Sequence, residues 1–156
     1  MTIDMLKEQE EDEGRAFQSV VHSTLLQQYA KGKYMIEFQD ISKTNSILRK
    51  NEIKYENLRD YSKDELAKLL GVDALSSGTI RRAAPMSAGA AVAMALVTGY
   101  GGSTNKVSVD YTIHEGQNGK LIWKFTHEIS GGLLSNSETM AKNLMKQVAN
   151  KFPYKK

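Results

Sequence analysis

The chain has 156 residues, with 21 Lys and Arg against 18 Asp and Glu, so its formal net charge is +3. This length is typical of one domain, and so small a positive surplus does not indicate a nucleic-acid partner. The sequence contains no cysteine, which excludes disulfides, thiolate metal sites and a cysteine nucleophile. We therefore expect a single domain over residues 1–156.

Residues 1–13 form a polar, acidic segment that ends in the run Glu10-Glu11-Asp12-Glu13. Such a run can be the solvated first turn of a helix, where carboxylates favour the positive end of the helix dipole, or a recruiting tail. From Gly14 to Tyr29 apolar side chains recur three and four residues apart. This spacing predicts a helix with one buried face, which ends at Gly32.

The next segment, Tyr34–Gln39, alternates apolar and polar side chains and predicts a half-buried strand. A short helix follows, for which Ser42 or Thr44 can serve as the N-cap. Residues 51–61 are polar with scattered apolar side chains. We expect a loop with some helical turn there.

A capping box predicts the start of another helix, because Ser62 is followed three residues later by Glu65. Gly71 closes this helix. The segment Val72–Arg82 then predicts a strand that starts buried and ends charged.

Residues 83–105 contain no charged side chain and form an Ala- and Gly-rich insert. A membrane-spanning helix needs roughly 20 apolar residues, and the apolar part of this insert, residues 88–98, is about half that length. We therefore reject a spanning helix. The insert can be a helix buried against the sheet, which we favour, or a surface of small residues for self-association or membrane contact.

Two alternating segments, Asn105–His114 and Leu121–Ile129, predict a hairpin joined by the turn-forming residues 115–119. One register satisfies the apolar and the charged cross-strand pairs together. It places these residues opposite each other: Val109 and Phe125, Tyr111 and Trp123, Ile113 and Leu121, Lys106 and Glu128, Asp110 and Lys124.

Ser135 with Glu138, or Ser137 alone, can cap a last helix that Pro153 ends. Its predicted buried face comprises Met140, Ala141, Leu144, Met145, Val148 and Phe152. The whole order of elements predicts an α/β (α+β) fold, in which a mixed sheet carries a C-terminal antiparallel hairpin and helices pack on it.

No pattern indicates a catalytic, cofactor-binding or metal site, so we expect a protein that is not an enzyme and binds no cofactor. The three histidines, His22, His114 and His127, are expected to be structural. The hairpin places His114 beside the turn and His127 near the far end, so the two cannot share a metal ion.

Three segments, Lys33–Gln39, Asn45–Glu52 and Asp64–Ile80, together with the hairpin and the last helix, resemble a known group of proteins. It is the group of bacterial envelope lipoproteins that includes the curli-secretion lipoprotein CsgG, the penicillin-binding-protein activator LpoB and the amino-terminal domain of TolB. The resemblance covers roughly residues 15–152 and includes the motif Leu-Gly-Val-Asp-Ala that ends in Ala74.

The resemblance implies a fold like the amino-terminal domain of TolB and a non-enzymatic, periplasm-facing role. It also implies anchoring to the outer membrane through a lipid on an upstream segment, and action by binding an envelope protein or by forming homo-oligomers. Small and aromatic side chains of the insert are the expected contact surface. We select Met86, Ala90, Met94 and Tyr100.

The alternative is a small-molecule-binding protein or small enzyme with a pocket between the Ala-rich insert and the hairpin. Its candidate polar groups are His127, Arg81 and Asp110. A nucleic-acid binder that uses the Lys-rich last helix is disfavoured, because the net charge is small and no aromatic platform is evident.

Overall fold

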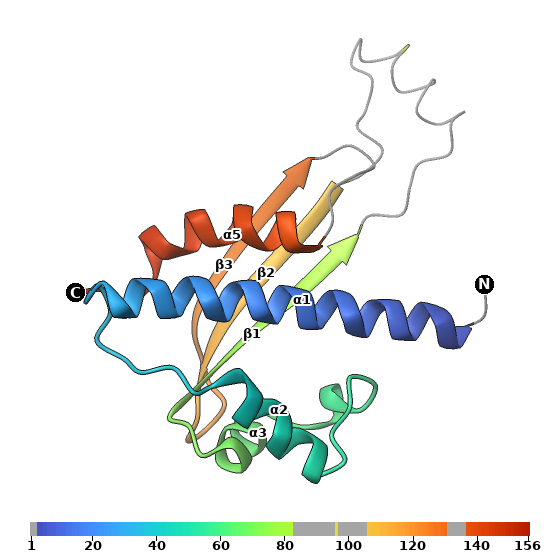
Figure 1. Ribbon diagram of the computed structural model, residues 1–156, viewed down its shortest axis with the longest axis horizontal. Helices are drawn as coiled ribbons and strands as arrows, with labels where there is room; N and C mark the ends of the chain where they lie inside the picture. The colour runs from blue at the N-terminus through green and yellow to red at the C-terminus, as the bar shows by residue number, and fades with distance from the viewer. Residues whose placement is uncertain (1–2, 83–95, 97–105, 131–136) are drawn as a thin grey trace.

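The computed structural model describes residues 3–82, 96, 106–130 and 137–156. Helices and a sheet combine in an α+β fold, which confirms the predicted class (Figure 1). Two long helices, α1 and α5, lie across one face of the sheet, and α2 and α3 lie toward one end of it. The elements are α1 (Ile3–Ala30), α2 (Ile41–Lys50), the 3-10 turn η1 (Leu58–Asp60), α3 (Lys63–Leu70), β1 (Ala74–Arg82), β2 (Lys106–Glu115), β3 (Leu121–Ser130) and α5 (Ser137–Lys151).

The described sheet has the order β1-β2-β3 and is antiparallel throughout, where a mixed sheet was expected. The predicted hairpin is present, but its register is different. Tyr111 lies opposite Phe125, and Ile113 lies opposite Trp123. The turn closes with the Glu115 N–H donating to the Lys120 carbonyl (2.8 Å), and the register then shifts at a bulge beside Ile113.

This register differs from the predicted one by two residues, so every side chain keeps its predicted face. The predicted apolar side chains therefore lie on the predicted face of the sheet, but each lies opposite a different residue from the one predicted. Lys106 lies opposite Ser130 instead of Glu128. Lys124 is not directly opposite Asp110, but its ammonium reaches the carboxylate diagonally at 3.2 Å.

The core lies between the sheet and the two long helices. In α1 and α5 the buried residues recur three and four apart, and in β2 they alternate, as both periodicities require. The predicted face of the last helix is confirmed for its described members, which lie in α5 from Ala141 to Val148, and Phe152 directly after α5 is buried as well. The buried residues of this core cluster are Phe17, Val21, Leu25, Tyr34, Val109, Tyr111, Ile113, Ala141, Leu144, Met145, Val148 and Phe152.

The predicted strand at Tyr34–Gln39 is wrong. Among the described residues a single antiparallel bridge forms there, between Tyr34 and Lys155, because the C-terminal residues and not a long strand lie beside it. The Tyr34 ring is buried against Phe152, with the ring centroids 4.8 Å apart. The alternation therefore reflects packing of an extended segment on the core.

The first helix begins at Ile3 and not at Gly14. The acidic run lies inside this helix, past its first turn, and Arg15 pairs with Glu11 one turn earlier. Helix-dipole stabilisation of the first turn therefore does not explain the run.

The N-cap of α2 is Asp40, and not Ser42 or Thr44. Its carboxylate accepts the backbone N–H groups of Ser42 (2.8 Å) and Lys43 (3.2 Å). The hydrogen bonds from these N–H groups lower the pKa of Asp40, and the bond from Lys43 has the larger effect. The capping box of α3 is confirmed, and Gly71 ends that helix in the left-handed conformation (φ 65°).

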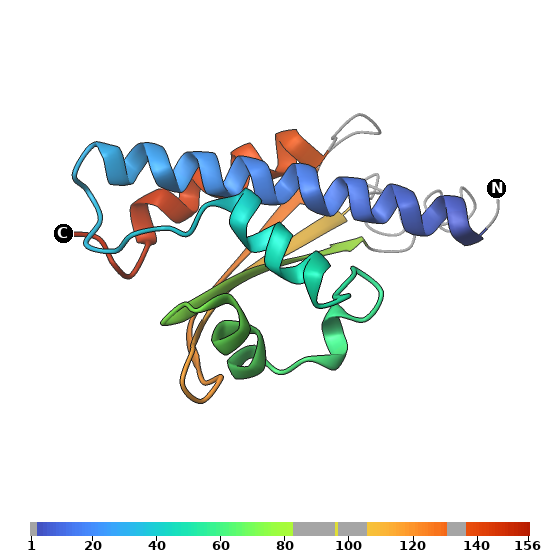
Figure 2. The ribbon, with the colours of Figure 1, turned by 60° about the horizontal axis from the view of Figure 1, so that its bottom comes forward.

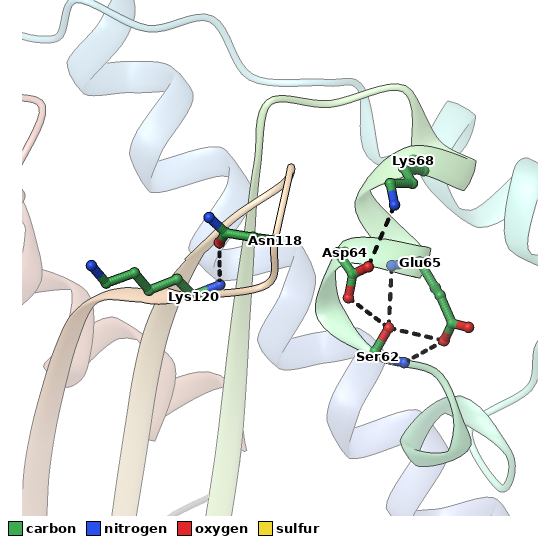
Figure 3. A network of polar contacts seen from close by, with 6 residues as sticks. All are labelled: Ser62, Asp64, Glu65, Lys68, Asn118 and Lys120. Carbon is green, nitrogen blue, oxygen red and sulfur yellow. Dashed lines mark hydrogen bonds and ion pairs between the residues drawn. The ribbon is translucent and has the colours of Figure 1, made fainter.

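Helix α3 sits against the hairpin turn (Figure 3). Its capping network joins the Ser62 hydroxyl to Asp64 (2.7 Å) and Glu65 (3.0 Å). The backbone approaches closely at Gly116, whose N–H donates to the Asp73 carbonyl (2.8 Å). A Cβ at that position would meet the Val72 carbonyl oxygen at 2.7 Å, so the turn requires glycine there.

Candidate binding surface

One face of the sheet lies toward α1 and α5, and the other face lies away from them (Figure 2). The side chains on that other face are mostly polar. Side chains alternate along each strand, so Asp110 and Thr112 point away from the core that Val109 and Tyr111 enter. Most of the neighbouring side chains on that side are exposed. We call this set the polar sheet face: Ser77, Thr79, Arg81, Asp110, Thr112, Lys124, Thr126 and Glu128.

A buried carboxylate lies at the centre of the polar sheet face. Asp110 is only 5% exposed, although the face around it is in solvent. Its Oδ2 pairs with the Arg81 guanidinium and with the Lys124 ammonium (3.2 Å), and its Oδ1 accepts the Thr126 hydroxyl (2.7 Å). A buried carboxylate stays charged at acceptable cost only with such partners.

The two cations have a different environment from the carboxylate that they share. The Arg81 and Lys124 side chains are 63% and 46% exposed, whereas that of Asp110 is 7% exposed. The cluster therefore neutralises the buried charge and still presents positive groups to solvent. Beside it, the hydroxyls of Ser77 and Thr112 share a hydrogen bond (3.0 Å) between β1 and β2.

The structure brings together two of the three residues predicted for a ligand pocket. Arg81 and Asp110 form an ion pair, but His127 lies opposite Val109 on the other face of the sheet. The remaining predicted contact residues lie outside the part of the chain that the structure describes, as does the Ala-rich insert apart from Leu96. These residues are Met86, Ala90, Met94 and Tyr100.

A row of aromatic rings runs along β3 on the helix side. Trp123 stacks with Phe125 (centroids 6.0 Å apart, planes 10° apart), and Phe125 stacks with His127 (6.4 Å, 14°). The Lys151 ammonium lies 5.3 Å from the Phe125 centroid, within cation–π range. The alternation of Leu121–Ile129 predicted that these three rings share one face of a strand, but it did not predict that they stack in a row.

Two buried polar atoms have no hydrogen-bond partner among the described residues: Tyr111 Oη and His114 Nδ1. Burial raises the pKa of Tyr111 to about 12. Burial first, and then the nearby Lys63 charge, lower the pKa of His114. His22, in contrast, has a structural hydrogen bond of 3.0 Å to the Gln39 carbonyl.

Other features of the described residues point to no further site. No three His, Asp or Glu side chains within them are placed to hold a metal ion. A polar depression of about 410 Å³ is lined by Glu52, Lys54, Glu56 and Asn57, and it contains none of the predicted ligand-binding groups. None of the described helices is long and apolar enough to cross a membrane.

No protein-family model and no curated protein sequence matches this chain. Among solved structures, the lipoprotein GNA1162 from Neisseria meningitidis aligns with a TM-score of 0.40 and 18% sequence identity. The alignment covers 73% of this chain and 69% of that one. A TM-score at this level does not establish a shared fold.

Proposed function

We propose that this chain is a non-enzymatic binding domain of the bacterial cell envelope, which acts through contacts with another protein or with further copies of itself. The resemblance of its three sequence segments to envelope lipoproteins supports the location. Anchoring to the outer membrane by a lipid, facing the periplasm, is the arrangement that this resemblance implies.

The arrangement of Asp110 is the observation that carries the binding role. A catalytic carboxylate needs a free oxygen that faces a substrate. Here both oxygens of Asp110 are occupied, by Arg81 and Lys124 on one side and by Thr126 on the other. Such a cluster stiffens a sheet face and presents charged groups at its surface, which suits recognition of another macromolecule.

Cell fractionation with metabolic lipid labelling tests the location, with the protein expressed from its complete natural gene. We expect the protein in the membrane fraction with the lipid label attached. An unlabelled protein in the cytosol would overturn the envelope proposal.

The competing function is small-molecule binding, and the ion pair of Arg81 with Asp110 is the observation that favours it. A guanidinium 63% exposed beside a buried carboxylate could bind an anionic metabolite. This function predicts saturable thermal stabilisation by some member of a metabolite panel, and loss of that stabilisation in Arg81→Gln. A flat response across the panel favours the protein-binding role.

A further inference from the structure

Strand β3 lies at an edge of the described sheet, with β2 on one side and no described strand on the other. It is ten residues long and contains no proline. Leu121 and Ile122 near its start are each 48% exposed. Long apolar edges pair readily with another strand, and natural proteins usually cover or charge them.

We propose that β3 pairs antiparallel with β3 of a second copy of this chain, about a two-fold axis through Thr126. This deepens the proposed function by naming the partner and the surface. In this arrangement Thr126 faces its own counterpart. Lys124 then lies opposite Glu128 of the second copy, and symmetry repeats that ion pair on the other side of the axis.

Charge complementarity is the argument for a second copy as the occupant. Lys124 and Glu128 stand on the same face of β3, equally far from Thr126 and opposite in charge. Glu128 is exposed and has no ion-pair partner within the described residues. The strand is therefore complementary to itself when it is reversed.

The ion pair inside the chain is compatible with the new one. Lys124 contacts Asp110 at 3.2 Å, but its side chain is 46% exposed and its ammonium has three donors. Arg81 also pairs with Asp110. Lys124 can therefore bind Glu128 of the second copy without leaving the buried carboxylate unpaired.

The helix-side face of β3 supports the same register. Phe125 would lie opposite His127 of the second copy, so the aromatic row of one chain meets that of the other. Both side chains are only partly buried within one chain and have surface left to cover.

The opposite edge of the sheet lacks this property. Strand β1 carries Arg81 and Arg82 at one end and no acidic residue, so a second β1 offers no opposite charge. It also contains Gly78, which weakens a strand interior. The β1 edge therefore serves as the internal control for the β3 edge.

A disulfide trap tests the register, and the absence of native cysteine makes single-cysteine variants unambiguous. Thr126→Cys places a thiol on the proposed axis, where paired Cα atoms would be about 4.5–5.5 Å apart, within reach of a disulfide. Thr79→Cys is the matched control, because both threonines are exposed and lie opposite Asp110 from the two edges. On mild oxidation we expect a covalent dimer from Thr126→Cys and a monomer from Thr79→Cys. Equal trapping of both, or of neither, overturns the proposal.

Sedimentation equilibrium of the full chain over a concentration series tests the charge argument. Glu128→Lys would place like charges together at both symmetric positions, so we expect the dimer dissociation constant to rise about tenfold or more. Asp12→Lys makes the same charge change on α1 and should leave the constant unaltered. A monomer at every concentration, or a dimer that Glu128→Lys leaves unchanged, overturns the proposal. A thermal melt of each variant separates unfolding from dissociation, and neither experiment depends on the cellular location.

Discussion

The ring of Phe17 occupies the space that a side chain at position 78 would need. A Cβ built on Gly78 would lie 2.7 Å from Phe17 Cε1, closer than any normal contact. The missing side chain of β1 thus allows α1 to lie directly on the strand. The pair couples the first helix of the chain to the edge of the sheet.

We expect Gly78→Ala to lower the free energy of unfolding by about 1–3 kcal/mol, because the added methyl group overpacks a filled site. Chemical denaturation gives this value. Phe17→Leu removes the ring atoms that clash, so the double variant should lose less stability than the two single losses added together. Strict additivity would show that Phe17 and Gly78 are not coupled.

Asp110→Asn tests the cluster on the polar sheet face. The neutral amide of Asn no longer balances the positive charges of Arg81 and Lys124. It can keep only some of the hydrogen bonds that the carboxylate accepts from Arg81, Lys124 and Thr126. Both cations remain partly in solvent, so we expect a loss of about 1–3 kcal/mol and not the larger cost of a fully buried pair. Asp12→Asn, at an exposed position of α1, is the control and should change stability by less than about 0.5 kcal/mol. Equal effects of the two variants would show that the Asp110 contacts contribute nothing.

His114 makes stability depend on pH. Its pKa in the folded protein lies below the ordinary value of 6.5, because burial first and Lys63 second oppose its charge. Well above pH 6.5 both states hold the neutral ring, and the contribution of His114 to stability is complete. As the pH falls from there toward the folded-state pKa, the unfolded state takes up the proton more readily, and stability is lost.

Denaturation of wild type and His114→Gln between about pH 8 and about pH 5 measures this effect. As the pH falls, the unfolding free energy of wild type should decrease more than that of His114→Gln. His127→Gln controls for the loss of a histidine as such. Parallel curves for wild type and His114→Gln would contradict the expected role of His114.

The capping assignments can be tested with two serines. Ser62 caps α3 with its hydroxyl, so Ser62→Ala should cost about 1 kcal/mol of stability. Ser42 lies within the first turn of α2, whose cap is Asp40, so Ser42→Ala should cost only a few tenths of a kcal/mol. Thermal melts of both variants distinguish the caps. Equal losses would contradict the assignment of Asp40.

Local patterns were sufficient for much of the fold. The capping box of α3, its end at Gly71, the hairpin and the buried face of α5 all depend on residues close together in sequence. The acidic run is not the first turn of a helix, because α1 begins at Ile3, before the run. Tyr34–Gln39 alternates like a strand, yet whether a strand forms depends on a neighbour to pair with.

The candidate site shows the same division. The sequence identified Arg81, Asp110 and His127 as polar groups that could bind a ligand. It did not show that Arg81 and Asp110 lie together while His127 lies on the other face of the sheet. A shift of one position along a strand moves a side chain to the other face of the sheet. Which side chains then lie beside it depends on how strands distant in sequence pair. Asp110 and Arg81 meet because β1 pairs with β2, a contact between segments 29 residues apart.

The sequence by itself determined the apolar faces of α1, α5 and the hairpin strands, and where α3 begins and ends, because periodicity and capping act within a few residues. Only the tertiary structure decided the hairpin register, the burial of Asp110 and the position of β3 at an edge of the described sheet. Each of these depends on which distant segments lie side by side, and the contacts that choose among the alternatives form only in the folded chain.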